Sequence, residues 1–324
     1  MAGFGAIAEN AHLCALRSVG ADVRAVFDPA PARREAAGRL APNARVYDRL
    51  DTLLSSEKSL DALIVCSPPG FHADAVLDGL RAGLHVLCEK PLTLDTAEFE
   101  DIRRESIERN LCVYSINNWA YSPQWFSLLE IAASGRLGAI SHAEIRVLRT
   151  KPSTSAQPGD WRRDPAVSGG GILVDHGWHN LYLMRRLLGL ELSLAETVLH
   201  PSGAVDEVAT ILLKAPATAG TIHLSWRANE RSNYVFVAGE KASAELRDDV
   251  LSVKAGGIEE TVHFLEKLSA GSAHPEWLAA MWPAFEAECA GLGRGENLAE
   301  AAFCLSAIRG AYARSRGLES FSNA

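Results

Sequence analysis

The sequence predicts an α/β protein with two domains, at residues 1–116 and 117–324. In the first, strand-like and helix-like segments alternate, which is typical of a doubly wound parallel sheet covered by helices. A glycine-rich turn at residues 3–8 precedes the first of these helices. In the second, several strands separated by short turns follow a glycine-rich helix, and they predict a large open, mainly antiparallel sheet.

The alternation in the first domain can be followed segment by segment. The run at 62–66 is apolar throughout, as expected for a strand of a parallel sheet that is buried on both faces. Pro68, Pro69 and Gly70 then break the chain before the next helix. The predicted strands are 22–27, 62–66, 85–88 and 111–115, and the predicted helices are 11–19, 32–40, 73–82 and 96–109.

The second domain begins with a helix and continues into a sheet. Residues 151–165 are polar and predict a loop, and an open antiparallel sheet leaves one face to contact a ligand or a second subunit. The predicted strands are 141–150, 208–213, 221–226, 234–238 and 242–246, and the predicted helices are 124–133, 274–290 and 298–316.

Composition excludes several classes of protein. The net charge is −8 and no basic stripe occurs, which argues against nucleic acid and against an anionic membrane as partners. No apolar run approaches the roughly 18–20 residues that span a bilayer, and no signal peptide is recognisable, so we expect a cytoplasmic protein. The 6 cysteines include no C-x-x-C pair, which argues against a zinc site or a disulfide framework.

The turn from Gly3 to Ala8 fits the pattern G-x-G-x-x-G/A that binds the pyrophosphate of a dinucleotide. Gly3 and Gly5 would let the backbone approach the phosphates, and Ala6 and Ile7 would begin the helix that adds partial positive charge. Asp28 ends the next strand and suits a carboxylate that binds a ribose 2′-hydroxyl, or else a helix cap near Pro29.

The strand that should precede this turn is missing from the sequence, because only Met1 and Ala2 stand before Gly3. In a doubly wound sheet that strand is central, and without it two neighbouring strands would lack hydrogen-bond partners. We therefore expect the true start about six residues upstream. The alternative is a damaged cofactor domain.

Three side chains could move a proton. Lys90 follows an apolar strand, while Asp175 and His179 stand four residues apart and so share one face of the predicted helix. Oxidation of a secondary alcohol needs a hydride acceptor and a base for the hydroxyl proton, and either Lys90 or His179 could be that base. Taken alone, Asp175 and His179 fit a surface pair better than a catalytic pair. A metal site is not expected, since no third ligand is evident.

The ordered motifs resemble those of the Gfo/Idh/MocA oxidoreductases over nearly the whole chain. The most specific are Glu89-Lys90-Pro91 and the stretch from Gly169 to His179, which reads G-G-G-x-L-x-D-x-G-x-H. The resemblance implies a Rossmann-like first domain and a second α/β domain whose sheet forms homodimers or homotetramers. It also implies sugars, inositols or related polyols as substrates.

The resemblance also implies individual roles. Lys90, preceding Pro91 through a cis bond, would contact both the substrate and the nicotinamide ribose, His179 would accept or donate the proton, and Asp175 would orient the substrate or support His179. The remaining residues implied to line the cofactor site are Ser67, Pro68, His72 and Glu89.

Several features leave substrate and cofactor choice open. Where many family members carry N-x-R-F-x-P, residues 118–123 read Asn-Trp-Ala-Tyr-Ser-Pro, with Ala120 at the arginine position. Trp161 and Arg162 lie on the loop before the glycine-rich helix and could reach the substrate or simply be solvated. Asp28 favours NAD, although Arg33 and Arg34 could accept the 2′-phosphate of NADP.

The favoured function is therefore NAD(P)-dependent hydride transfer to or from a sugar or polyol. One alternative on the same scaffold is a glycoside hydrolase that oxidises its substrate transiently with bound NAD. A second alternative is a ligand-binding or regulatory protein that has lost affinity for the cofactor.

Overall fold

The computed structural model describes residues 1–152, 161–271 and 273–322, and the chain divides into two compact units. The first unit comprises Met1–Asn118 and Ala273–Ala302, and the second comprises Trp119–Ser272 and Phe303–Ala324. Residues 273–302 thus pack with the first unit, although they follow the expected boundary at 116/117.

The first unit contains a parallel sheet, as expected. Its strands are β1 (Ala25–Phe27), β2 (Arg45–Tyr47), β3 (Ala62–Val65), β4 (His85–Cys88) and β5 (Val113–Ser115). Strand β1 pairs with β2, and β4 lies between β3 and β5, with all pairs parallel. The carboxyl ends of β3 and β4 lie side by side, because Val65 is the partner of Cys88 in the register.

The first three residues join these two groups of strands. Ala2 forms isolated parallel bridges to both Phe27 and Val65. Its N–H donates to Ile64 O at 2.8 Å and its carbonyl accepts from Cys66 N at 2.7 Å, while Gly3 N donates to Phe27 O at 2.8 Å. The expectation that β1 and β3 would lack partners is therefore wrong at this end of the sheet, because Met1–Gly3 occupy the central position.

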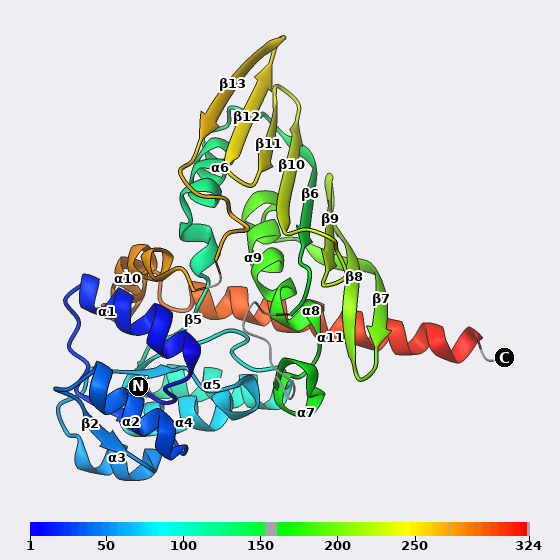
Figure 1. Cartoon of the computed structure of the whole chain (residues 1–324). Helices are drawn as coiled ribbons and strands as arrows, with labels where there is room; N and C mark the ends of the chain where they lie inside the picture. Colours follow the sequence, from blue (N-terminus) through cyan, green and yellow to red (C-terminus); the bar gives the residue numbers. More distant parts are fainter. Residues whose placement is uncertain (153–160, 272, 323–324) are drawn as a thin grey trace. The chain divides into compact units, whose positions relative to one another are not determined.

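Helices cover this sheet (Figure 1). The chain enters them through a π-helical turn, Ala8–His12, that continues into α1 (Leu13–Ser18). A 3₁₀ turn (Pro69–Phe71) precedes α4. The other helices of the unit are α2 (Pro31–Leu40), α3 (Leu50–Ser56), α4 (His72–Arg81), α5 (Thr96–Arg109) and α10 (Pro275–Cys289).

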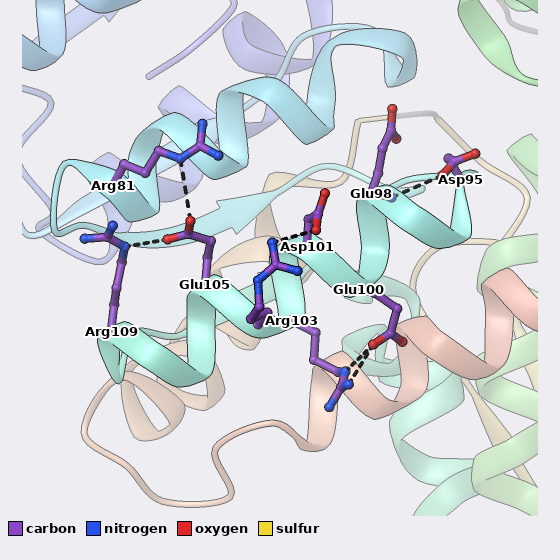
Figure 2. Close-up of polar contacts among 9 residues, drawn as sticks. Arg81, Asp95, Glu98, Glu100, Asp101, Arg103, Glu105 and Arg109 are labelled. Atoms are coloured by element: carbon purple, nitrogen blue, oxygen red, sulfur yellow. Dashed lines mark hydrogen bonds and ion pairs between the residues drawn. The ribbon is translucent and has the colours of Figure 1, made fainter.

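Residues at both ends of helix α5 explain where it begins and ends. The Asp95 side chain accepts hydrogen bonds from the N–H groups of Ala97 and Glu98, and Asn110 ends the helix in a left-handed conformation with φ 55°. Figure 2 shows the solvent side, where Glu105 pairs with Arg81 and Arg109 at 3.7 and 2.6 Å. Exposed pairs of this kind contribute at most about 1 kcal/mol each.

The second unit contains an eight-stranded sheet in the order β13-β12-β11-β10-β6-β9-β8-β7. Only β6 and β9 pair in parallel, so the prediction of a mainly antiparallel sheet is confirmed. The strands are β6 (Ile140–Leu148), β7 (Ser193–Ser202), β8 (Val205–Ala215), β9 (Thr218–Ser225), β10 (Ser232–Gly239), β11 (Ser243–Arg247), β12 (Val250–Ala255) and β13 (Ile258–His263).

Helices α6 (Pro123–Ala133), α8 (Ile172–Asp175) and α9 (Gly177–Leu188) pack on one face of this sheet (Figure 1). Helix α9 contributes fully buried side chains to the core, among them Trp178 and Tyr182. The unit also contains 3₁₀ turns at Asn118–Tyr121 and Trp161–Arg163 and a short helix, α7 (Pro165–Ser168); α11 (Glu296–Ser322) passes from the first unit into the second. No helix in the described part of the chain is long and apolar enough to cross a membrane.

Candidate active site

The turn after Met1 and Ala2 leaves space beside its second glycine. Gly3 has φ +90°, and a Cβ there would lie 2.8 Å from Ser67 N, so this position requires glycine. At Gly5, by contrast, a Cβ would have no described atom within 4 Å. Ala6 and Ile7 begin the helical segment directly after it. The backbone of the turn is therefore open to a ligand at Gly5.

Asp28 stabilises this turn. The N–H of Phe4 donates to Asp28 Oδ2 at 2.8 Å, and the N–H of Ala30 donates to Oδ1 at 2.9 Å. The second bond closes a turn around Pro29, whereas α2 (Pro31–Leu40) has no side-chain cap at Ala30, so the helix-cap interpretation of Asp28 is not confirmed. Arg33 Nε donates to Phe4 O at 2.8 Å, so one of the two neighbouring arginines also holds the turn. Ribose binding by Asp28 stays a prediction.

The region fits a dinucleotide. Within residues 1–152, 161–271 and 273–322, the buried Ser67 Oγ has no hydrogen-bond partner. It lies just past the carboxyl end of β3, and the backbone N of Ser67 lies next to Gly3 of the turn that would bind the phosphates. Pro68 accepts a backbone hydrogen bond from Phe71 and begins the 3₁₀ turn that leads to α4.

Glu89 and Lys90 directly follow β4, and the peptide bond between Lys90 and Pro91 is cis, as expected. The carboxylate of Glu89 lies 2.8 Å from Nε2 of His12, a residue that no sequence motif indicated. The side chains of His12 and Glu89 are 2% and 13% exposed. The pair connects the helix after the glycine turn to the lysine-bearing loop.

Electrostatics keep this pair charged. Burial opposes the charge on His12, but the Cys66 sulfur and the Glu89 carboxylate outweigh it and raise the pKa of His12 to about 10. Burial likewise acts to raise the pKa of Glu89, but the hydrogen bond from His12 and the charges of His12 and Lys90 lower it.

His72 connects the segments that follow strands β3 and β4. Its Nδ1 lies 2.7 Å from Pro91 O and its Nε2 lies 2.7 Å from Ser67 O. The side chain is fully buried, and burial lowers the pKa of its imidazole. His72 thus holds the segments that carry Ser67 and Lys90 at one edge of the sheet, whereas direct contact with a cofactor stays a prediction.

In the second unit, the protein itself fills the space beside the glycine-rich turn. A Cβ on Gly171 would lie 1.9 Å from Asp206 O, and one on Gly170 would lie 2.1 Å from Tyr312 Oη. The Asp206 carboxylate accepts from Gly171 N and Leu173 N, both at 2.9 Å, and from Tyr312 Oη at 2.5 Å. Asp206 and Tyr312 therefore fix the start of helix α8.

The predicted single helix after this turn is wrong in one respect. The structure has two helices, α8 ending at Asp175 and α9 starting at Gly177, with His176 between them. Glycine weakens a helix interior, and the Asn180 side chain donates to His176 O at 2.7 Å, which favours the break. Asp175 and His179 consequently belong to different helices. The Asp175 carboxylate lies 3.3 Å from Nδ1 of His176.

His179 is held by aromatic side chains. Its ring stacks on Trp119 with centroids 5.0 Å apart and an interplanar angle of 10°. Its Nδ1 lies 3.3 Å from the hydroxyl of Tyr182. His179 is 6% exposed, so its surroundings restrict the imidazole on several sides.

Cationic groups also lie in the second unit. The Arg162 guanidinium lies 4.4 Å from the centroid of the Trp161 ring, and both residues are half-buried. Part of the predicted loop before them, residues 153–160, lies outside the described residues. Arg149, which no sequence motif indicated, is 3% exposed. Burial and Arg231 lower its pKa to about 10, while the carboxylates of Asp248 and Asp175 act to raise it.

The structure thus groups the predicted residues within two units. Gly3, Gly5, Asp28, Ser67, His72, Glu89 and Lys90 belong to the first, and Trp161, Arg162, Asp175 and His179 belong to the second. The residues that sequence reasoning missed are His12, Trp119, Arg149, Asp206 and Tyr312. Only Trp119 carried a local signal, because it stands in the segment that departs from the Asn-x-Arg-Phe-x-Pro pattern.

Two protein-family models match this chain. An oxidoreductase family model with an NAD-binding Rossmann fold matches residues 1–117, and the Gfo/Idh/MocA C-terminal domain matches residues 127–245. The chain belongs to the Gfo/Idh/MocA family. This member is thus an oxidoreductase-family protein whose first unit is an NAD-binding Rossmann fold, and the expected fold class is confirmed.

Curated relatives of this Gfo/Idh/MocA protein include an uncharacterized protein of Saccharomyces cerevisiae, 31% identical over 68% of this chain and 65% of that one. Inositol 2-dehydrogenase of Rhizobium meliloti is 28% identical over 65% of this chain and 64% of its own length. The matches to this chain span only part of such relatives, down to 40% for inositol 2-dehydrogenase of Corynebacterium glutamicum.

Solved structures share the whole fold. A levoglucosan dehydrogenase in complex with NADH and levoglucosan has a TM-score of 0.84 at 17% identity, covering 98% of this chain and 96% of that one. A 3-ketoreductase from Actinomadura kijaniata in complex with NADP and TDP-benzene has a TM-score of 0.80 at 21% identity, covering 96% of each chain. At these identities the likeness concerns the fold.

Proposed function

We propose that this protein transfers a hydride between NAD and a secondary alcohol of a sugar, an inositol or a related polyol, with NADP as a possible second cofactor. The observation that carries the proposal is the position of Lys90. It follows β4 at the carboxyl edge of the parallel sheet, where the neighbouring strand leads to Ser67 and the open glycine turn. Ligands bind at this edge of doubly wound sheets.

The proposed division of work follows from the residue types. The backbone N–H groups of the turn at Gly5 bind the pyrophosphate, and Ser67 and Glu89 border the nicotinamide end. When bound, nicotinamide supplies the acceptor or donor of the hydride. Lys90 anchors the substrate oxygen by a hydrogen bond. We propose that His179 takes or returns the hydroxyl proton and that Asp175 orients the substrate, although Lys90 is the alternative base.

The names of relatives support the substrate class. Several are inositol 2-dehydrogenases, and a neighbour in fold is a levoglucosan dehydrogenase. Inositol and levoglucosan are both polyhydroxylated ring compounds. Trp161 and Arg162 would contact such a ring from the loop before α7.

Calorimetric titration with NAD and NADP tests the cofactor half of the proposal. We expect saturable binding with a preference for NAD. Failure to bind either nucleotide would favour a ligand-binding or regulatory protein instead. Release of the leaving group from a glycoside, without net NADH formation from myo-inositol or levoglucosan, would favour the hydrolase variant.

Turnover of myo-inositol or levoglucosan tests the site residues. Lys90→Ala and His179→Ala should each lower kcat by at least about a hundredfold, because general acid–base groups contribute that much or more. Lys58→Ala on the exposed surface is the matched control and should keep the wild-type rate. Near-normal rates in both site variants would contradict the assignment of Lys90 and His179.

We also propose a homodimer or homotetramer formed through the outer face of the eight-stranded sheet. Val198 and Leu212 are 51% and 39% exposed on adjacent strands of this face. Light scattering of the protein in solution tests this, and a monomer at micromolar concentration would contradict it. Location in the cytoplasm stays a prediction.

A further inference from the structure

The indole of Trp119 contacts the imidazole that the proposed function uses. Trp119 lies in the 3₁₀ turn Asn118–Tyr121, and His179 lies in the first turn of α9. Their rings are nearly parallel, 10° apart, with centroids separated by 5.0 Å. This is an offset stack, and an indole packed against one face of an imidazole restricts rotation of that ring about χ2 toward the indole.

Tyr182 restricts the same imidazole from another direction. Its hydroxyl lies 3.3 Å from Nδ1 of His179, and its ring meets the imidazole edge-on, at 77° and 5.9 Å. A hydrogen bond at one ring nitrogen selects the tautomer and directs the other nitrogen. Trp119 and Tyr182 thus contact the imidazole of His179 on one face and at one ring nitrogen.

The same indole also contacts the second histidine of the segment. Trp119 meets His176 edge-on, with centroids 6.3 Å apart and an angle of 87°. His176 is held on its other sides by the Asp175 carboxylate at 3.3 Å and by the ring of Trp226 at 6.5 Å and 81°. One side chain therefore contacts the imidazole at the break between α8 and α9 and the imidazole in the first turn of α9.

We propose that Trp119 is a positioning residue that holds His179 in the orientation needed for proton transfer. This inference rests on the proposed function, in which His179 accepts or donates the proton. A general base must approach the proton it takes to hydrogen-bond distance. Displacement of a reacting group by about 1 Å can lower the rate a hundredfold, so loss of the stack should appear in kcat.

The titratable groups around His179 are the Tyr182 hydroxyl, His176 and, beyond it, Asp175. Arg149 adds a buried positive charge that interacts with Asp175. Replacement of Trp119 removes none of these titratable groups, so a change in the pH profile reports the loss of the indole. An aromatic face stabilises a cation that lies over it, whereas leucine does not.

The test compares Trp119→Leu with Trp119→Phe, which keeps an aromatic face at the same place. Trp282→Leu on α10 is the matched control, because Trp282 is also half-buried but belongs to the first unit. With NAD and myo-inositol or levoglucosan, W119L should lower kcat at least about tenfold. KM for NAD should not change. The acid limb of kcat should move to lower pH by about half a unit. W119F should recover most of the rate, and W282L should match the wild type.

A spectroscopic measurement separates this inference from the proposed function. The ring ¹³C–¹H signal of His179, assigned by its loss in His179→Gln, should titrate at lower pH in W119L and should broaden as the imidazole samples several orientations. An unchanged His179 signal in W119L would overturn the positioning role. A kcat within twofold of the wild-type value together with an unchanged pH profile would overturn it too. If H179Q kept full activity while W119L still altered the His179 signal, the proposed base would be wrong but the stack confirmed.

Discussion

Each unit places a glycine-rich turn before a helix, and the space beside the two turns differs. Beside Gly170 and Gly171, where side chains are absent, atoms of Tyr312 and Asp206 occupy the space, at 2.1 and 1.9 Å from the position of a Cβ. Beside Gly5, no described atom outside the adjoining residues lies within 4 Å of that position. Gly170 and Gly171 thus serve internal packing, as Gly3 does in the first unit, whereas Gly5 leaves open space beside the backbone of its turn.

An aspartate anchors both turns, again in different ways. Asp28 accepts the N–H of Phe4 and also that of Ala30. Asp206 accepts the N–H groups of Gly171 and Leu173 together with the hydroxyl of Tyr312. Similar glycine motifs can therefore have a binding role or a packing role, and only the neighbouring atoms distinguish them.

The largest expected effect is that of Gly171→Ala. Because the new methyl group would overlap the Asp206 carbonyl, strand β8 or the start of α8 must move, at a cost of about 4 kcal/mol or more. Urea unfolding followed by circular dichroism measures this loss. Gly5→Ala is the matched control and should change the unfolding free energy by less than about 1 kcal/mol. Equal destabilisation by the two variants would remove the distinction between the turns.

The sequence predicts elements well where local signals agree. The predicted bounds 85–88 and 96–109 match β4 and α5, because a continuous apolar run marks the strand and the Asp95 cap marks the helix. The sequence gives no alternating signal for β13, because every residue of this strand is exposed, and β13 was not predicted. The elements β2, α3, β7 and β12 were not predicted either.

The candidate site was less predictable from the sequence, because its supports come from distant segments. Asp206 is 35 residues from Gly171, and Tyr312 is 141 residues away. His12 is 77 residues from Glu89. No local pattern indicates such pairs, whereas Lys90, Asp175 and His179 stand in ordered motifs that the sequence shows together. The break at His176 was also not predicted, although the residues that favour it, Gly177 and Asn180, lie close to it in the sequence.

A second prediction concerns the buried pair of His12 and Glu89 in the first unit. His12→Gln should destabilise the protein by about 3 kcal/mol near pH 6, because it leaves the buried Glu89 carboxylate without its cation. The pKa of His12 is about 10 in the folded protein, against an ordinary value of 6.5 for a solvated imidazole. Charged His12 therefore stabilises the fold fully below pH 6.5, and this contribution declines as the pH rises to 10.

Urea midpoints at pH 6, 8 and 10 measure this dependence. The urea midpoints of wild type and H12Q should become more similar as the pH rises from 6 to 10. At acid pH the pair also weakens: because the pKa of Glu89 is lowered in the folded protein, its stabilising contribution is lost as the pH falls below about 4.5. A difference that stayed constant from pH 6 to pH 10 would show that packing, and not the charge on His12, stabilises the loop that carries Lys90.

The smallest expected effect is that of Gly5→Ala on cofactor binding. Its methyl group would enter the open space beside the turn, where the backbone must approach a pyrophosphate, so NAD should bind about tenfold more weakly. Calorimetric titration measures the dissociation constant, and Gly38→Ala, which also has no described atom within 4 Å, is the control. Gly38 lies in α2, away from the turn, so that variant should bind NAD as the wild type does. Unchanged affinity in G5A would place the dinucleotide elsewhere and would remove the ligand role from the open turn.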